Sequence, residues 1–263
     1  MDLAVLLPWV LGTAALSAVF GMAGGMVLLL VLSSRMPLAE AMVLHGALQL
    51  VSNGSRAVIS ARYVRLDLVG RFGAAGIATA LVVGALALSV AEVAALAIDL
   101  RLVLVATGVL ACAEPLLGSL GGRSLRLPQI DTHRGSLIAG SVISALHLTS
   151  GATGPLLDAF CVNSALGRHE NVATKAAFQA LGHTLKIAYF IAVGTATATL
   201  TSDVLSAEAL PSFAVLAVAS IAGTWLGRRA LDRMSDDGFR RATRAIVCAI
   251  GVISLARGLW LYA

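Results

Sequence analysis

The sequence predicts an all-α polytopic membrane protein made of two inverted repeats, and three observations support this fold class. First, 58% of the 263 residues are hydrophobic and only 13% are charged, whereas soluble domains contain about 25% charged residues. Second, the apolar stretches could supply seven or eight crossings, at about 20 residues per membrane helix. Third, glycine clusters interrupt two of these stretches at matching places in the two halves of the chain.

The apolar stretches follow one another at 3–33, 37–61, 66–90, 97–118, 135–165, 170–200, 209–230 and 240–262. The first is broken by GMAGG at 21–25, and the fifth is broken by SGATGP at 150–155. Such breaks release backbone N–H and C=O groups that lipid cannot satisfy, so we expect both to lie inside the protein along a cavity. Close helix packing is the alternative interpretation of the glycines.

A shift of 130 residues aligns 21–60 with 151–190 and indicates an internal repeat. The identical pairs are Gly21 with Gly151, Gly24 with Gly154, Ser34 with Ser164, Glu40 with Glu170, Ala47 with Ala177 and Gln49 with Gln179. The further polar pairs are His45 with Lys175, Asn53 with His183 and Arg56 with Lys186. Six identities in forty pairs is a small number, but the matched polar positions are rare in so apolar a chain.

Loop charges predict the orientation in the membrane. The loops 62–71, 119–134 and 228–241 are basic and should be cytoplasmic, whereas 91–100 and 201–208 are acidic and should lie outside. These sides are consistent only if the fifth stretch turns back as a re-entrant hairpin, and we expect the same of the first. Each half then makes about three crossings plus one hairpin, as in many transporters with inverted repeats. An eight-helix bundle with a parallel repeat is the alternative.

This topology divides the chain into a first transmembrane repeat (1–118), a cytoplasmic linker (119–134) and a second transmembrane repeat (135–263). Both termini are predicted outside. The net charge of +5 lies mainly in the short basic loops, so membrane topology accounts for it and we expect no nucleic-acid partner.

Several motifs resemble the TauE/SafE family of sulfite and organosulfonate exporters. These motifs are GMAGG at 21–25, GATGP at 151–155, ATKAAFQALGHTLKIAY at 173–189, and Gly223 and Gly227 before a basic loop. Three departures concern the substrate: a short first glycine run, Pro155 in the second break, and His183 where the family usually has Asn. The resemblance implies a multi-pass protein of the bacterial cytoplasmic (inner) membrane that exports a small inorganic or organosulfur anion.

Arg56 and Lys186 lie within apolar stretches at matching repeat positions, and a charge at membrane depth is costly unless it has a partner or a function. In an inverted repeat both can face one midplane cavity, where the N-termini of broken helices also favour an anion. Alternatively, Arg56 extends to the cytoplasmic interface. The predicted substrate-binding residues are Gly24, Gly25, Asn53, Arg56, Ser150, Gly151, Thr153, Gly154, His183 and Lys186.

His147, His183 and Asp158 are candidates for proton coupling, because histidine titrates near neutral pH. The alternatives are structural histidines, and an Asp158 that is either a counter-ion of Lys186 or a residue near the cytoplasmic end of the hairpin. Gln49 and Gln179 could line the cavity or tie helices together.

We therefore predict a secondary transporter that works by alternating access and is driven by a proton gradient or the membrane potential. It needs no cofactor and no metal. The sequence has no Walker A, HExxH or GxSxG motif, so an ATP-driven pump or an enzyme is not supported. An anion channel with the same site, an intramembrane enzyme and a structural membrane subunit remain as alternatives. Exact substrate, direction, coupling ion and a homodimeric assembly are left open.

Overall fold

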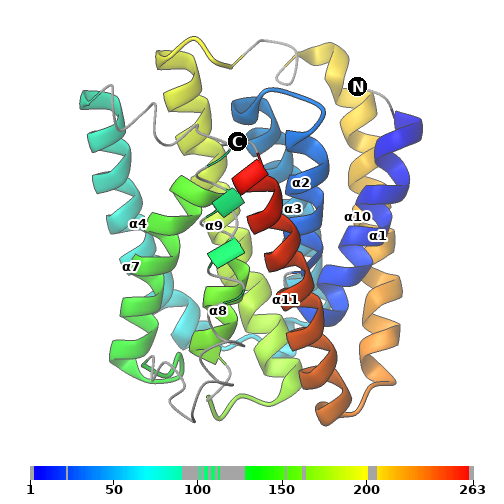
Figure 1. Cartoon of the computed structure of the whole chain (residues 1–263). Coiled ribbons are helices and arrows are strands. Elements are labelled where there is room, and N and C mark those ends of the chain that lie inside the picture. The colour runs from blue at the N-terminus through cyan, green and yellow to red at the C-terminus, as the bar shows by residue number, and fades with distance from the viewer. Residues whose placement is uncertain are drawn as a thin grey trace.

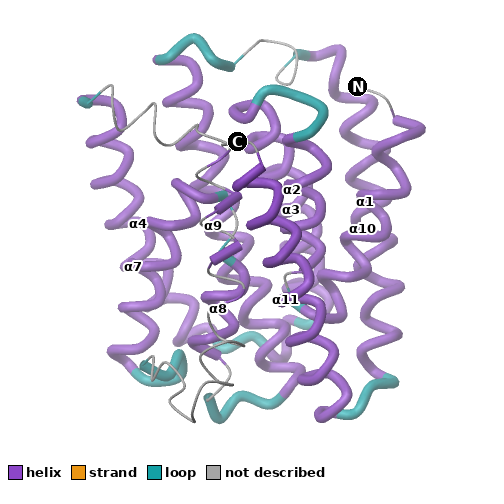
Figure 2. The backbone as a smooth tube through the Cα atoms, viewed as in Figure 1, coloured by secondary structure: helices purple, strands orange, loops and turns teal. Residues whose placement is uncertain are grey.

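The computed structural model describes residues 3–21, 23–90, 128–151, 153–161, 164–200 and 206–260, and the single positions 101, 104, 105, 108, 109 and 112. Within these residues all regular structure is helical, as Figure 2 shows. The helices are α1 (Leu3–Phe20), α2 (Ala23–Ser33), α3 (Leu38–Ile59), α4 (Leu66–Ser89), α7 (His133–Ser150), α8 (Gly154–Cys161), α9 (Arg168–Ala196), α10 (Leu210–Asp232) and α11 (Asp236–Trp260). Two short 3-10 helices are η1 (Ala61–Tyr63) and η3 (Ala207–Ala209).

Four described helical segments are long and apolar enough to cross a membrane: Leu3–Phe20, Leu66–Ser89, Arg168–Ala196 and Ala207–Asp232. This supports the predicted helical membrane protein, with fewer candidate spans than the sequence suggested. One reason is that α3 has many polar side chains facing the protein interior. Another is that 91–127, which includes most of the linker, lies largely outside the described residues.

Both glycine clusters coincide with a helix break. Gly21 follows α1 with φ +89°, and Gly151 follows α7 with φ +71°. Glycine adopts this left-handed region without the steric cost that a Cβ imposes, and it commonly ends helices in this way. After the breaks the chain resumes helical structure at Ala23 and at Gly154.

The two broken segments run in opposite senses in Figure 1. Helix α2 runs back along α1 toward the side of the N-terminus, whereas α8 runs back from α7 toward the other side. Each short helix contacts the long helix that precedes it, and α2 also contacts α8. Both breaks are therefore brought toward the interior of the bundle.

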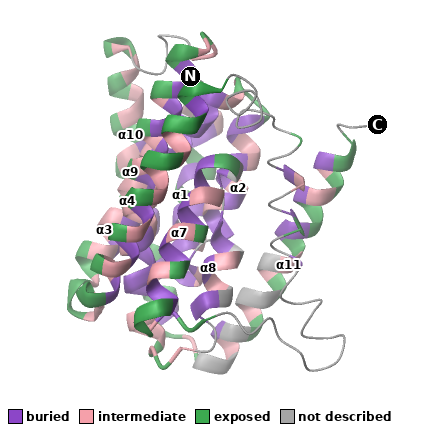
Figure 3. Ribbon diagram, turned by 90° about the vertical axis from the view of Figure 1, so that its left-hand side faces the viewer, coloured by how far each residue is buried: buried purple, intermediate pink, exposed green. Residues whose placement is uncertain are grey.

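Helices α3 and α9 pack against each other at the centre, with α1 against α10 and α4 against α7 on the flanks. Exposed residues gather on the outer helices in Figure 3. Large apolar side chains exposed there include Leu81, Val82, Leu86, Val218 and Leu226. Such surfaces suit lipid, because acyl chains can cover them as a protein interior would.

Several glycines allow helices to approach closely. A Cβ at Gly24 would lie 1.7 Å from the carbonyl oxygen of Thr13 in α1. At Gly223 and Gly227, a Cβ would lie 2.2 Å and 2.3 Å from backbone oxygens of α1. Gly24, predicted to bind substrate, therefore faces α1, and the structure gives it a packing role.

Candidate functional site

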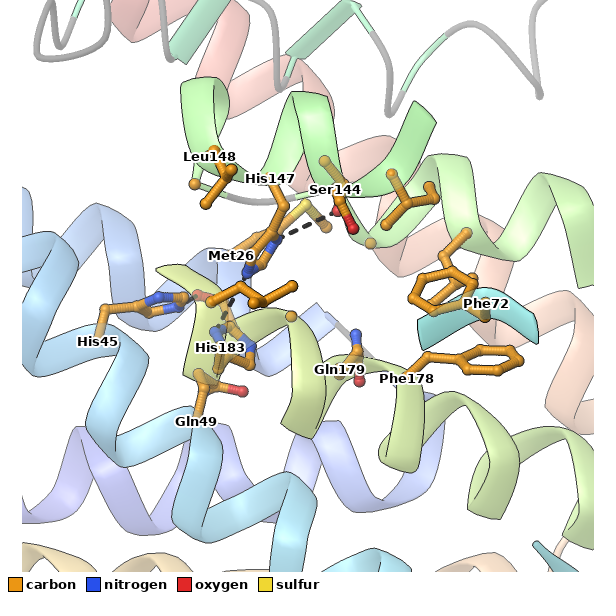
Figure 4. A pocket seen from close by; sticks show the side chains of 18 residues that line it. Met26, His45, Gln49, Phe72, Ser144, His147, Leu148, Phe178, Gln179 and His183 are labelled. Carbon is orange, nitrogen blue, oxygen red and sulfur yellow. Dashed lines mark hydrogen bonds between the residues drawn. The ribbon is translucent and has the colours of Figure 1, made fainter. Parts of the chain in front are cut away.

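A small cavity lies between the two breaks and is lined from α2, α3, α4, α7, α8 and α9 (Figure 4). Its volume is about 40 Å³, which exceeds the roughly 10–15 Å³ that one water requires. The polar side chains in its wall are His45, Gln49, Ser144, His147, Thr153, Gln179 and His183. The opposite wall is apolar and includes Phe72 and Phe178, whose rings stack with centroids 4.2 Å apart.

Three of the histidines gather at the polar end of the cavity, one each from α3, α7 and α9 (Figure 4). His147 Nε2 lies 3.3 Å from His183 Nδ1, and His147 Nδ1 lies 3.2 Å from Thr153 Oγ1. The His45 and His183 rings meet edge to face at 5.4 Å. Within the described chain no group of three or more His, Cys, Asp or Glu side chains could hold a metal ion.

Lys186 and His45 connect the two broken segments. The fully buried Lys186 Nζ lies 2.8 Å from His45 Nδ1 and donates to the carbonyl of Gly151 at 3.1 Å. His45 Nε2 lies 2.8 Å from the carbonyl of Gly25. Because a carbonyl only accepts, Nε2 of a neutral His45 must carry the proton, and Nδ1 then accepts from Lys186. This chain of hydrogen bonds joins the start of α2 to the end of α7.

Arg56 binds the end of α1. Its guanidinium donates to the carbonyls of Ser17 and Gly21, the latter at 3.1 Å. It also donates to Asn53 Oδ1 and, at 2.9 Å, to Gln179 Oε1. The residue is only 3% exposed, so its side chain does not extend to an interface. A cation here stabilises the carbonyl end of α1, where the Gly21 carbonyl lies beyond the last helical turn and the Ser17 carbonyl also accepts from the Gly21 N–H at 2.7 Å.

The two cations make equivalent contacts. Arg56 binds the carbonyl of Gly21, and Lys186 binds that of Gly151. Both the cation and the glycine are displaced by 130 residues. At each break, a basic side chain from the same repeat position therefore binds the glycine carbonyl at the helix end.

The predicted substrate-binding residues fall into three groups. Gly25, Gly151, Thr153, Gly154 and His183 line the cavity. Asn53, Arg56 and Lys186 are buried but absent from its wall. Gly24 packs against α1, and Ser150 ends α7 with a side chain outside the described part of the structure.

Among the proton-coupling candidates, His147 and His183 line the cavity and Asp158 does not. Asp158 forms an ion pair with Lys175, whose side chain is 3% exposed. Its observed counter-ion is thus Lys175 rather than Lys186.

Two polar residues of the cavity wall, His45 and Ser144, and its apolar side chains were not among the predicted site residues. His45 could have been found from its repeat position, because it stands opposite Lys175. Ser144 lies three residues before His147, and therefore on the same face of α7.

A comparison with protein-family models identifies the family of the chain. A model described as "Sulfite exporter TauE/SafE" matches residues 6–253. The chain belongs to the TauE/SafE family. Neither a curated protein nor a solved structure matches it. Family membership and the apolar helices together make this TauE/SafE chain a multi-pass membrane protein of a sulfite-exporter family.

Proposed function

We propose that this TauE/SafE protein is a secondary transporter that exports sulfite or a similar organosulfur anion by alternating access. The observation that carries the proposal is the pair of buried cations that bind the two helix breaks, Arg56 of α3 and Lys186 of α9, beside a polar cavity. Lys186 and Arg56 are 0% and 3% exposed. No acidic residue is among the described residues that line the cavity. Lys186 contacts His45 of the wall and Arg56 contacts Gln179. An anion in the cavity therefore lies near positive charge and meets no carboxylate in the described wall.

The cavity also supplies donors for oxygens. The hydroxyls of Ser144 and Thr153, the amides of Gln49 and Gln179, and the imidazole of His183 all lie in its wall. Hydrogen bonds to an ionised acceptor are about twice as strong as neutral ones. A three-oxygen anion can use several of these donors at once. The apolar wall of Phe72 and Phe178 can contact the organic part of a sulfonate.

Alternating access is supported by the helix contacts. Four of them recur when each helix is replaced by its counterpart in the other half. The pairs α1–α10, α3–α10, α1–α2 and α1–α3 correspond to α7–α4, α9–α4, α7–α8 and α7–α9. Together with the opposite senses of the two broken pairs in Figure 1, this supports inverted repeats with two re-entrant hairpins. In such folds one unit rocks against the other around a fixed site.

In this proposal the protein resides in the bacterial inner membrane, with both termini outside and the η1 side cytoplasmic. A proton gradient or the membrane potential drives transport. His147 and His183 lie in the cavity wall, where they can accept a coupling proton. Asp158, which is not part of the wall, is a third candidate.

The test is exchange of labelled sulfite in proteoliposomes, comparing wild type with Lys186→Met. We expect wild type to exchange sulfite and Lys186→Met to lose exchange by about a hundredfold, as for removal of a charged group bound in a site. Arg257→Met is the matched control, because Arg257 is a basic residue of α11 that donates to the Leu30 carbonyl away from the cavity.

Equal exchange by wild type and Lys186→Met would contradict the proposed site. Failure of wild type to exchange sulfite or any of a panel of sulfonates would contradict the substrate class. A sulfite current far above transporter turnover in planar bilayers would show a channel instead.

A further inference from the structure

A second cluster of buried charges lies apart from the cavity, on the side where α9 begins. Lys175 and Lys186 are 11 residues apart on α9, which corresponds to about 16 Å along the helix axis. Lys175 forms its ion pair with Asp158 of α8. None of Arg56, Lys175 and Asp158 lines the cavity described above.

The glycine break of the first hairpin joins Lys175 to Arg56. Arg56 donates to the Gly21 carbonyl at 3.1 Å. A Cβ built on Gly21 would lie only 3.0 Å from Lys175 Nζ. The two cations therefore flank the same residue, one from α3 and the other from α9. With Asp158 they make two positive charges and one negative charge in a buried setting.

Three buried polar atoms around this break have no hydrogen-bond partner among the described residues. They are Arg56 Nε, Ser17 Oγ and Asp158 Oδ2. Arg56 and Ser17 are 3% and 1% exposed, and the Arg56 guanidinium is bonded to the Ser17 carbonyl. A buried donor without a partner destabilises the protein, so such atoms are rare unless a ligand pairs with them. The guanidinium Nε–H of Arg56 and the Ser17 hydroxyl can each donate to an oxyanion.

We propose that Arg56 and Lys175, with the Ser17 hydroxyl, form a second anion-binding subsite for a small oxyanion such as sulfite. The Asp158 carboxylate is the internal competitor that occupies Lys175 when the anion is absent. An arriving anion displaces this carboxylate and balances the excess positive charge. Under the orientation of the proposed function, the subsite lies between the cytoplasm and the cavity and receives the anion before export. This inference rests on that proposed function.

The repeat explains why the competitor exists in only one half. Lys175 corresponds to His45, and Arg56 corresponds to Lys186, under the shift of 130 residues. The residue that corresponds to Asp158 is Leu28, an apolar side chain that is 1% exposed. The cavity site thus has a basic pair without a carboxylate, whereas the second subsite has a basic pair with one.

The test measures sulfite binding to the purified full-length protein by titration calorimetry. Asp158→Asn keeps the shape of the side chain and removes the competing charge. We expect it to bind sulfite about tenfold more tightly, because the anion no longer has to displace a carboxylate from Lys175. Asp67→Asn is the matched control: Asp67 pairs with Arg65 on the exposed start of α4, so the affinity should equal that of wild type.

Asp158→Asn combined with Lys175→Gln should lose the gain in affinity, since the cation that Asp158 masked is then absent. Unchanged or weaker sulfite binding by Asp158→Asn would overturn the inference.

If Asp158→Asn does not fold, the double variant replaces it, because removing both partners of a buried pair leaves no unpaired charge. Sulfite uptake from the η1 side should then fall below wild type, and an equal rate would overturn the subsite.

The two proposals fail in different ways. If Lys186→Met abolishes sulfite exchange but Asp158→Asn does not tighten binding, the second subsite alone is wrong. If wild type, Asp158→Asn and the double variant all fail to bind sulfite, both proposals are wrong.

Discussion

At both helix breaks a buried cation binds the carbonyl of a glycine, but the two cations differ in their number of hydrogen-bond partners. At the first break Arg56 donates to four acceptors: two carbonyls of the α1 end and the side chains of Asn53 and Gln179. At the second break Lys186 contacts two, His45 and the Gly151 carbonyl. Both cations stabilise a broken helix. The comparison teaches that the cation with fewer partners retains more capacity to interact with an anion.

The largest expected effect is a difference in protein stability between variants that lack Arg56 and variants that lack Lys186. Arg56→Met leaves three buried acceptors without a donor, because the Ser17 carbonyl also accepts from the Gly21 N–H. Each such loss costs roughly 1–3 kcal/mol. We expect a loss of at least about 3 kcal/mol in the free energy of unfolding, against about 2 kcal/mol for Lys186→Met. Thermal denaturation of both variants in detergent, followed by the loss of monodisperse protein, measures the difference.

Arg56→Lys is the informative companion variant. It keeps the charge but cannot supply the planar fork of donors, so its stability should lie between those of wild type and Arg56→Met. If Lys186→Met proved the less stable of the two neutral variants, the ranking of the two breaks would be reversed.

A smaller effect compares the two glycines that end the broken helices. Gly21 and Gly151 both have positive φ, so alanine at either position should cost about 1–2 kcal/mol. Gly151→Ala should cost more, because its Cβ would lie 2.5 Å from both Sδ and Cε of Met42. At Gly21 the nearest atom is the Lys175 ammonium at 3.0 Å, the end of a flexible side chain.

Gly54→Ala is the matched control for these variants. Gly54 is in α3, and a Cβ there would meet nothing within 4 Å. It should raise stability by about 0.5–1 kcal/mol, the helix preference for alanine over glycine. A larger loss for Gly21→Ala than for Gly151→Ala would show that Met42 adapts more easily than Lys175.

Much of the fold followed from the sequence because its signals are local. A glycine cluster within an apolar stretch predicts a break wherever the helix lies, and both breaks are found at the predicted residues. The burial of Arg56 and Lys186 also agrees with their positions within long apolar stretches. The family resemblance, carried by the same breaks and by 173–189, is confirmed by the match over 6–253.

The contacts of the site could not be predicted in the same way, because they depend on how α3 and α9 cross. His45 contacts Lys186, which is 141 residues away in the chain. Asp158 of α8 forms an ion pair with Lys175 of α9, and nothing in the spacing of these residues indicates this pairing. The hydrogen-bond partners of the two cations were also not predicted. Both cations bind carbonyls at helix ends, and these carbonyls occupy part of their hydrogen-bonding capacity.

The smallest expected effect tests a hydroxyl that only the second break possesses. Thr153 lies 3.2 Å from His147 Nδ1, whereas its repeat counterpart is Ala23. Thr153→Val keeps the shape and removes this partner, so the His147 ring loses one of its two hydrogen-bond partners and is held less firmly. We expect sulfite affinity to fall roughly fivefold, the equivalent of about 1 kcal/mol. Thr149→Val is the control, since the exposed Thr149 bonds only to carbonyls of its own helix. Calorimetric titration with sulfite measures both, and equal affinities would show that the second break does not orient His147 for the anion.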